Sequence, residues 1–531
     1  LFIRGINFHV AILFSVRRRS SNLVQKNIPN KSLSINMVTS VLSRIVVLIT
    51  GLIVQHFILQ AYGSTLNGLT SSITQVMSYL VLFEAGLGTA SIQALYDPLS
   101  RNDWKKVSGI VVATGVEYKK ITAAFSSVLL LVSLVLPFTL KGQVEFAVAS
   151  LLTAVTGGSY IASYIVGGKY KAILSADRKM YVLYILDMLS STLSCVLRVM
   201  ALRVGAGIVW VQLLHLGSIL FKNAGYFIYV KIRYKRIDYK GTPDLQSISK
   251  RWSVLIHSIA GIVVNHTDVI ILTLFASLKT VSVYSVYNMV FGQLSTTIQS
   301  TFIQAPQAHF GILYYKDKRK FEQSFRVYET VFTILLFWIC GIALVMITPF
   351  VEVYTKGITD IEYIDKWLPI LFTLILLLNL LRSPAVMAVN VSGAFKETQK
   401  GAIIEAIINI TVSLILFFAT NLGLYGLLIG TVCSYIYRTT DLIYYTYKHI
   451  VGCNISDFIR TVIVNFALLG LMYYFACIKF PIQAASFVGW IASAVIVTIV
   501  VSVELIVGNI VLNRERVSEI YSVIKTKLAG Q

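Results

Sequence analysis

Long apolar runs alternate with short polar segments along the 531-residue chain. Many of the runs reach about 20 residues, the length that an α-helix needs to cross roughly 30 Å of hydrocarbon. A membrane-spanning β-strand would instead alternate polar and apolar residues over about 10 positions. The pattern therefore predicts an all-α integral membrane protein with about fourteen transmembrane helices. The predicted spans are 37–61, 67–95, 119–140, 144–167, 180–202, 204–230, 253–277, 280–307, 327–354, 366–392, 400–420, 422–447, 458–478 and 483–507.

Two charged islands interrupt this pattern in the same way. LYDPLSRNDWKKVSG at 95–109 and LYYKDKRKFEQSF at 313–325 each follow a polar-rich second span, 67–95 or 280–307. We expect both polar-rich spans to face other helices or water. The shared order predicts two six-helix pseudo-repeats of the same orientation, with a central cavity between them.

The domain organisation follows from the one long hydrophilic linker. The predicted parts are a basic N-terminal segment at 1–36, a first six-helix bundle at 37–230, a cytoplasmic linker at 231–252, a second six-helix bundle at 253–447, a C-terminal helix pair at 458–507 and a cytoplasmic tail at 508–531. The first of these carries its basic residues after its apolar run, the reverse of a secretory signal. We interpret it as an interfacial segment or an artefact of the assigned translation start.

Composition and charge sharpen the topology. Only 13% of the residues are charged and the mean hydropathy is +0.75, whereas soluble domains carry about 25% charged residues. The net charge of +22 would suggest nucleic acid in a soluble protein. Here, 34 of the 46 Lys and Arg residues fall in alternate gaps between spans, and only six fall in the remaining gaps. This asymmetry predicts that both termini are cytoplasmic and that no nucleic acid is bound.

Three stretches carry a resemblance to a known family: YGSTLNGL at 62–69, LFEAGLGTA at 82–90 and LYDPLSRND at 95–103. They resemble the amino-terminal signature of bacterial polysaccharide flippases in the MATE-like (multidrug/oligosaccharidyl-lipid/polysaccharide, MOP) superfamily. The resemblance implies a V-shaped transporter of the bacterial plasma membrane. It would carry undecaprenyl-diphosphate-linked oligosaccharide repeat units to the outer leaflet for capsule, exopolysaccharide or O-antigen assembly. Polysaccharide polymerases and glycosyltransferases of the same pathway, together with membrane lipid, are its implied partners.

Basic side chains within the spans are the candidates for holding such a diphosphate. An ionisable group in a span is costly and usually faces a cavity or a partner, and Arg binds phosphate in a bidentate manner. We favour Lys222 and Arg382, which lie deepest, and include Arg44 and Arg438. Snorkelling is the alternative for Arg44 and for a fifth cation, Arg198. For Arg438 the alternative is neutralisation by Asp441 three residues later.

Acidic residues within the spans are candidates for binding a coupling ion, either a proton or sodium. Asp268 is the preferred candidate because His266 stands two residues before it and could share a proton. Glu84, in FEAGLG, is the second candidate. For each acid, a plain ion pair between helices is the competing interpretation.

Several signals of other functions are missing from the sequence. It contains no GxxxxGK[ST] phosphate loop and no HExxH, and its five cysteines are scattered, so neither ATP hydrolysis by that route nor a metal site is indicated. The acids Glu352, Asp360, Glu362 and Asp365 are interpreted as part of a solvated outer loop. A membrane enzyme of lipid-linked sugar assembly would need a larger catalytic loop. A cation-coupled multidrug exporter of the same superfamily remains the main alternative to a flippase.

The charge asymmetry predicts which residues face the cytoplasm. Single cysteines at Ser100 and Lys318 should react with an impermeant maleimide only from the cytoplasmic side, whereas a cysteine at Asp360 should react from outside. Labelling in intact cells and in inverted vesicles measures both. External labelling at Ser100 would contradict the predicted orientation.

Overall fold

The computed structural model describes residues 30–80, 84, 86–248, 267–514, 516 and 518, and every regular element within them is helical. The predicted all-α class is confirmed. Nine helices in the described part of the chain are long and apolar enough to cross a membrane. The remaining residues lie outside the described part of the chain: 1–29, 81–83, 85, 249–266, 515, 517 and 519–531. They include the end of the linker, the start of the seventh predicted span, His266 and the end of the tail.

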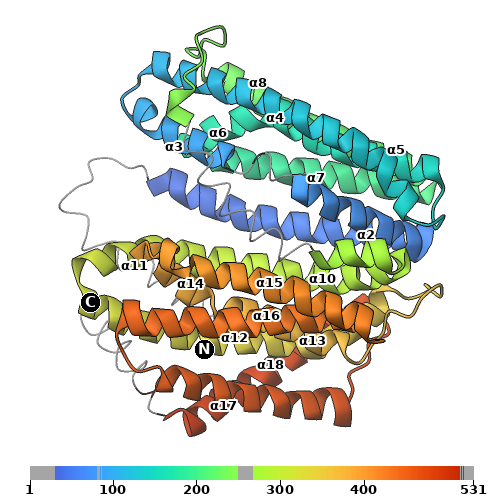
Figure 1. Ribbon diagram of the computed structural model, residues 1–531, viewed down its shortest axis with the longest axis vertical. Coiled ribbons are helices and arrows are strands. Elements are labelled where there is room, and N and C mark those ends of the chain that lie inside the picture. The colour runs from blue at the N-terminus through green and yellow to red at the C-terminus, as the bar shows by residue number, and fades with distance from the viewer. Residues whose placement is uncertain are drawn as a thin grey trace.

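The first half of the chain forms one group of helices, drawn from blue to green in Figure 1. Its elements are α2 (Asn30–Leu80), α3 (Leu87–Ser100), α4 (Trp104–Thr139), α5 (Phe146–Ala162), η2 (Ser163–Gly167), α6 (Gly168–Ala176), α7 (Met180–Arg203), α8 (Ile208–Arg233) and the short η3 (Gln246–Ile248). Residues 163–167, between α5 and α6, form a π-helical turn, so the two helices continue one another as the predicted span 144–167 requires.

The second half forms a matching group, with a further helix pair at the end of the molecule (Figure 1). Helical residues 267–275 precede α10 (Leu278–Ile298), η4 (Gln299–Gln304), α11 (Ala305–Lys316), α12 (Lys318–Tyr354), α13 (Leu368–Leu381), α14 (Ser383–Ser392), α15 (Phe395–Ala419), α16 (Leu424–Tyr445) and η5 (Thr446–Val451). The additional pair is α17 (Ser456–Tyr473) with η6 (Tyr474–Lys479), followed by α18 (Phe487–Leu512).

The first two predicted spans differ from the observed helices in two ways. Helix α2 runs through both predictions, with a kink at Gly63, whose backbone has φ 72° and ψ −175°. Glycine reaches this conformation without the steric cost of a Cβ atom. The second predicted span is then divided, since α2 ends at Leu80 and α3 begins at Leu87. Hydropathy alone merges such segments because it is insensitive to backbone direction.

The two charged islands adopt the same local structure. The carboxylate of Asp103 caps α4 by accepting a hydrogen bond from the Lys106 backbone N–H at 3.1 Å, and Asp317 caps α12 through the Lys320 N–H at the same distance. An N-cap carboxylate satisfies an otherwise unpaired helix donor. The backbone N–H of Lys320 also lowers the pKa of the Asp317 carboxyl below its ordinary value. Equivalent caps at equivalent places support the predicted repeat.

The buried apolar residues separate into two cores, one for each half. The first core holds Leu69 and Phe125, and the second holds Phe337 and Leu377. Two residues are exceptions, because Leu59 of α2 packs into the second core and Leu278 of α10 packs into the first. The helix pair α17–α18 packs on α12, where the Trp338 indole N–H donates to Ser502 Oγ at 2.9 Å. The predicted domain boundaries themselves stay a prediction.

Candidate functional site: a polar cavity between the halves

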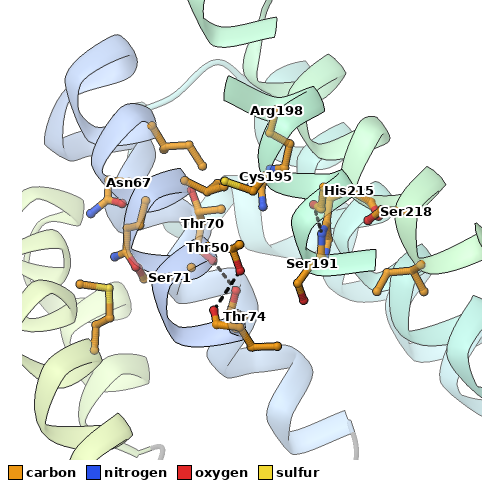
Figure 2. A pocket seen from close by; sticks show the side chains of 18 of the residues that line it. Thr50, Asn67, Thr70, Ser71, Thr74, Ser191, Cys195, Arg198, His215 and Ser218 are labelled. Carbon is orange, nitrogen blue, oxygen red and sulfur yellow. Dashed lines mark hydrogen bonds between the residues drawn. The ribbon is translucent and has the colours of Figure 1, made fainter. Parts of the chain in front are cut away.

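A cavity of about 410 Å³ lies where α2 faces α7 and α8, with α10 closing one side. Figure 2 shows Asn67, Thr70 and Thr74 of α2 on one side and Arg198 and His215 of α7 and α8 on the other. Most of the lining belongs to the first half, and the second half contributes only Ser285, Asn288 and Met289 of α10. A central cavity shared evenly by the two repeats stays a prediction. This volume is in the usual range for small-molecule sites.

The α7–α8 wall is basic. Arg198, His215 and Lys222 line it. The Lys222 Nζ atom is 3.0 Å from Asp187 Oδ1, so that ammonium group has a counter-charge. Arg198 differs, because its Nη2 donates only a long 3.4 Å hydrogen bond to Gln212 Oε1.

Arg198 lacks a carboxylate partner among the residues that the structure describes. Its Nε atom is buried and has no hydrogen-bond partner there. A guanidinium group offers five donors in a planar fork that matches carboxylate and phosphate. The wall thus presents a largely unused anion-binding group to the cavity.

The opposite wall is polar and uncharged. Hydroxyl and amide side chains recur on one face of α2 at the i, i+3, i+4, i+7 spacing that places side chains on the same helix side. The cavity-lining polar residues of α2 and α10 are Thr50, Gln55, Asn67, Thr70, Ser71, Thr74, Gln75, Ser285 and Asn288. Among the described residues, none that lines the cavity has a carboxylate side chain. The expectation that the polar-rich span starting at 67 faces water or other helices matches this face of α2.

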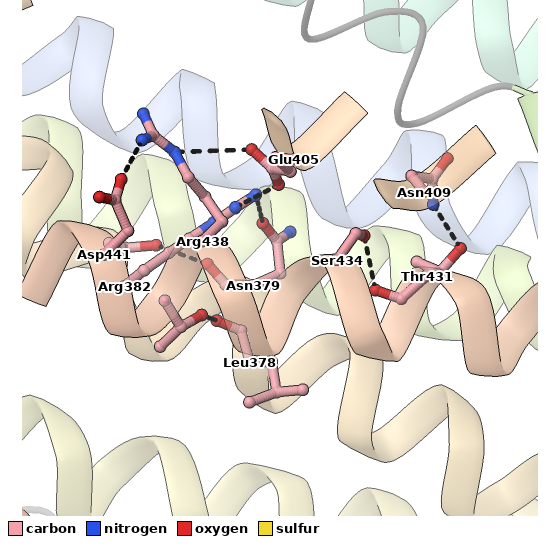
Figure 3. A network of polar contacts seen from close by, with 11 residues as sticks. Leu378, Asn379, Arg382, Glu405, Asn409, Thr431, Ser434, Arg438 and Asp441 are labelled. Carbon is pink, nitrogen blue, oxygen red and sulfur yellow. Dashed lines mark hydrogen bonds and ion pairs between the residues drawn. The ribbon is translucent and has the colours of Figure 1, made fainter. Parts of the chain in front are cut away.

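Of the four cations predicted to hold the diphosphate, Lys222 lines this cavity, whereas Arg382 and Arg438 lie in a separate cluster in the second half (Figure 3). Glu405 accepts a hydrogen bond from Arg382 and lies 3.6 Å from Arg438 Nε. Arg438 Nη1 is 2.7 Å from Asp441 Oδ2. Two arginines and two carboxylates therefore neutralise one another between α13, α15 and α16.

Further contacts hold the Arg382 side chain in place. Its Nη2 donates to Asn379 Oδ1 at 3.0 Å, and its guanidinium carbon lies 4.6 Å from the centre of the Tyr435 ring. A cation over an aromatic face gains electrostatic stabilisation. These contacts favour a structural role, and a substrate role for Arg382 and Arg438 stays a prediction.

Arg44 and Glu84 lie outside the cavity lining. Arg44 is exposed on α2. Glu84 accepts a hydrogen bond from the Tyr118 hydroxyl at 2.8 Å, which links the segment between α2 and α3 to α4. Their predicted roles as a cavity cation and a coupling acid stay predictions.

Asp268 is buried in the second half, away from the cavity lining. Thr431 Oγ1 donates to its Oδ2 at 3.1 Å, and Asn409 Nδ2 donates to Thr431 Oγ1 at 3.0 Å. Asp268 Oδ1 and Asn409 Oδ1 are both buried without a hydrogen-bond partner in the described part of the chain. No described Lys or Arg forms an ion pair with Asp268, so its surroundings differ from those of Glu405.

The position of Arg198 near a helix end, where snorkelling is common, favours it less than the other cations as a cavity residue. A signal for its position was nevertheless present. Ser190, Ser191, Ser194 and Arg198 recur at helical spacing on α7, and all four line the cavity. A serine-rich face that carries one arginine is polar beyond the need of a lipid-facing helix.

Arg382→Ala should destabilise the protein because it leaves Glu405 as an incompletely paired buried charge. Breaking a buried ion pair from one side costs roughly 3–5 kcal/mol, so membrane abundance and thermal stability in detergent should both fall. Glu405→Gln in the same chain should restore part of the loss. Arg198→Ala is the matched control and should leave stability nearly unchanged. Normal stability of Arg382→Ala with lost transport would instead place Arg382 in the substrate path.

Comparison with known proteins gives a fold. No protein family matches the chain, and no curated protein matches it in sequence. Among solved structures, the lipid II flippase MurJ in an inward closed conformation aligns over 91% of this chain and 99% of its own, with a TM-score of 0.63 and 14% identity. An inward-facing MATE-family multidrug transporter aligns over 82% and 99%, at 0.58 and 14%. A MOP-superfamily transporter from Pyrococcus furiosus aligns over 80% and 95%, at 0.51 and 16%. The chain therefore has the fold of the MOP-superfamily transporters.

Proposed function

We propose that this protein moves an anionic, lipid-linked oligosaccharide across the bacterial plasma membrane. The cargo class is the undecaprenyl-diphosphate-linked repeat unit used for capsule, exopolysaccharide or O-antigen assembly. The observation that carries the proposal is the lining of the cavity. In the part of the chain that the structure describes, this lining contains Arg198 without a carboxylate partner and contains no carboxylate side chain.

Arg198 supports an anionic cargo through its electrostatics. A cation held between helices without a counter-charge is costly, and a bound diphosphate would remove that cost. Charge-assisted, bidentate hydrogen bonds from guanidinium to phosphate oxygens are among the stronger polar contacts in proteins. Lys222, already paired with Asp187 at 3.0 Å, would add to the positive potential of the same wall.

The uncharged wall supports a sugar. Sugar hydroxyls donate and accept hydrogen bonds, and Ser, Thr, Asn and Gln side chains do the same. The hydroxyl and amide groups of α2, such as Thr70 and Thr74, lie across the cavity from Arg198 (Figure 2). At about 410 Å³ the cavity suits part of a polar headgroup, while a polyprenyl tail would stay in lipid.

A multidrug exporter of the same superfamily is the competing function, and the fold alone allows it equally. Organic cations need acidic or aromatic contacts, and neither type of side chain is prominent in this lining. For the Pyrococcus furiosus transporter, reversed polarity of the binding pocket suggests a different function. We therefore choose between a flippase for an anionic cargo and a multidrug exporter on the polarity of the cavity.

We further propose that Asp268 binds the coupling ion, a proton or sodium. Two buried oxygens, Asp268 Oδ1 and Asn409 Oδ1, lack partners in the described structure and are joined through Thr431. Carboxylate and amide oxygens are the ligands that hard cations prefer. Because no described cation pairs with Asp268, a purely structural ion pair is less well supported for it than for Glu405.

The proposed setting follows from the charge pattern and the family resemblance. Both termini would lie in the cytoplasm. Glycosyltransferases would supply the lipid-linked unit on that side, and a polymerase would consume it on the other side.

Loss of the gene should leave undecaprenyl-linked repeat units on the inner leaflet and reduce surface polymer, which lipid extraction and polymer staining measure. In that strain, Arg198→Ala should restore roughly a tenth or less of the export, since hydrogen bonds to charged groups contribute about 1.5–3 kcal/mol. Arg198→Glu should be worse because repulsion replaces attraction. Arg203→Ala, at the end of the same helix, is the matched control and should restore export. Unchanged polymer in the deletion strain would refute the proposed cargo.

Asp268→Asn should abolish export while leaving membrane abundance and thermal stability near those of the parent chain. Asparagine keeps the size and the hydrogen bond from Thr431 but cannot take up a proton or carry the charge that binds sodium. Export and abundance are measured in one strain. Low abundance would point to a structural role for the carboxylate. Full export at normal abundance would show that Asp268 has neither a coupling role nor a structural role.

A further inference from the structure

Asp360, which the sequence places in a solvated loop, makes specific contacts with the other half of the molecule. It belongs to the segment 355–367 between α12 and α13. The Ser64 hydroxyl donates to Asp360 Oδ1 at 2.6 Å, and the Ser64 backbone N–H donates to Oδ2 at 3.0 Å. One carboxylate of the second half therefore takes two hydrogen bonds from one residue of α2.

Tyr363 extends this contact inward. Its hydroxyl lies 2.6 Å from Ser64 Oγ and 2.7 Å from Ser282 Oγ of α10. Asn67 Nδ2 then donates to Ser282 Oγ at 2.7 Å. Ser64, Asn67, Ser282 and Tyr363 are almost fully buried, whereas about a third of the Asp360 side chain remains exposed. The network thus runs from the surface to the interior.

The inner end of the network is part of the cavity. Asn67 lines the cavity, and Figure 2 shows it on the α2 side, across from Arg198. The chain Asp360–Ser64–Tyr363–Ser282–Asn67 therefore runs from segment 355–367 to the cavity lining. We call these five residues the latch.

The backbone of α2 is shaped for this contact. A Cβ atom on Gly63 would lie 3.3 Å from Asp360 Oδ2, and the kink at Gly63 turns the Ser64 N–H toward the carboxylate. A Cβ atom on Gly68 would lie only 1.8 Å from the Leu278 carbonyl oxygen. Side chains at these two positions would push the halves apart at the latch.

The chemistry of the latch suits a contact that must open. Separating an apolar seal exposes hydrophobic surface to water, whereas hydroxyl, amide and carboxylate groups regain hydrogen bonds to water when they part. Each neutral bond then changes the balance between closed and open forms by a few-fold to about tenfold, and the bonds to the Asp360 carboxylate change it by about tenfold or more. Such a contact holds the halves together without fixing them permanently.

We propose that the latch is the gate that closes the cavity toward the end of the bundle carrying segment 355–367, and that Asn67 is its cavity-facing member. A headgroup that accepts the Asn67 amide hydrogens competes with Ser282 for them. Binding in the cavity would therefore weaken the gate from its inner end. Asn67, Ser64 and Asp360 are positioning residues in this scheme.

Cys195 provides a native reporter because it lines the cavity. In a chain whose other four cysteines are replaced by alanine, the rate of Cys195 reaction with an impermeant maleimide measures access to the cavity. The reagent is applied separately to each face of membrane vesicles. A second chain with Glu362→Cys and no other cysteine identifies the face to which segment 355–367 belongs.

Asp360→Asn, Ser64→Ala and Asn67→Ala should each raise the Cys195 rate by roughly tenfold from the face where Glu362→Cys reacts, and not from the other face. Glu362→Gln is the matched control, since Glu362 is an exposed acid of the same segment and should leave the rate unchanged. Rates equal to the control in all three latch variants would overturn the proposal, and so would equal increases from both faces. The measurement uses no cargo, so its result is separate from that of the proposed function.

Discussion

A charge inside hydrocarbon must be paired or wetted, and the arrangement of this protein depends on how each intramembrane charge meets that constraint. In the second half, Arg382 and Arg438 share Glu405, and Asp441 completes the balance. That cluster closes on itself and joins three helices. In the first half, Arg198 has no described counter-charge and faces a cavity instead. The same residue type is therefore structural in one half and available to a ligand in the other.

Helix α2 is where the two halves meet chemically. Its apolar residues divide between the cores, with Ile58 in the first and Leu59 in the second. Its polar face lines the cavity, and Ser64 contacts the opposite half. The kink at Gly63 allows one helix to serve these purposes, because the segments before and after it point in different directions. A change in how α2 packs would alter cavity and gate together.

The sequence was sufficient for the fold because the determinants are local. The length of an apolar run predicts a membrane span. The N-cap residues Asp103 and Asp317 lie within a few residues of the backbone N–H groups that they accept hydrogen bonds from. The division of α2 and α3 could not be predicted, since it depends on the backbone angles of Gly63 and on the break before Leu87.

The site was harder to predict because its partners are distant in sequence. Hydropathy treats five intramembrane cations alike, whereas the pairing of Arg382 with Glu405, 23 positions away, and the isolation of Arg198 are properties of helix packing. The sequence around Asp360 predicts an exposed loop, because no nearby residue indicates its hydrogen bond with Ser64, 296 positions earlier. The sequence did indicate the cavity wall on α7, where Ser190, Ser194 and Arg198 form one polar helix face.

The positions of the three polar features constrain how transport can be coupled. Arg198 lies in the first half, Asp268 lies in the second, and the latch joins the two halves through Asn67 and Ser282. None of the described hydrogen bonds or ion pairs links Asp268 to the cavity lining on α7 or α8. A ligand shifts a conformational equilibrium only by its difference in affinity for the two states. The cargo therefore has to contact a group whose partner changes on opening, and Asn67 is a cavity residue that meets this requirement.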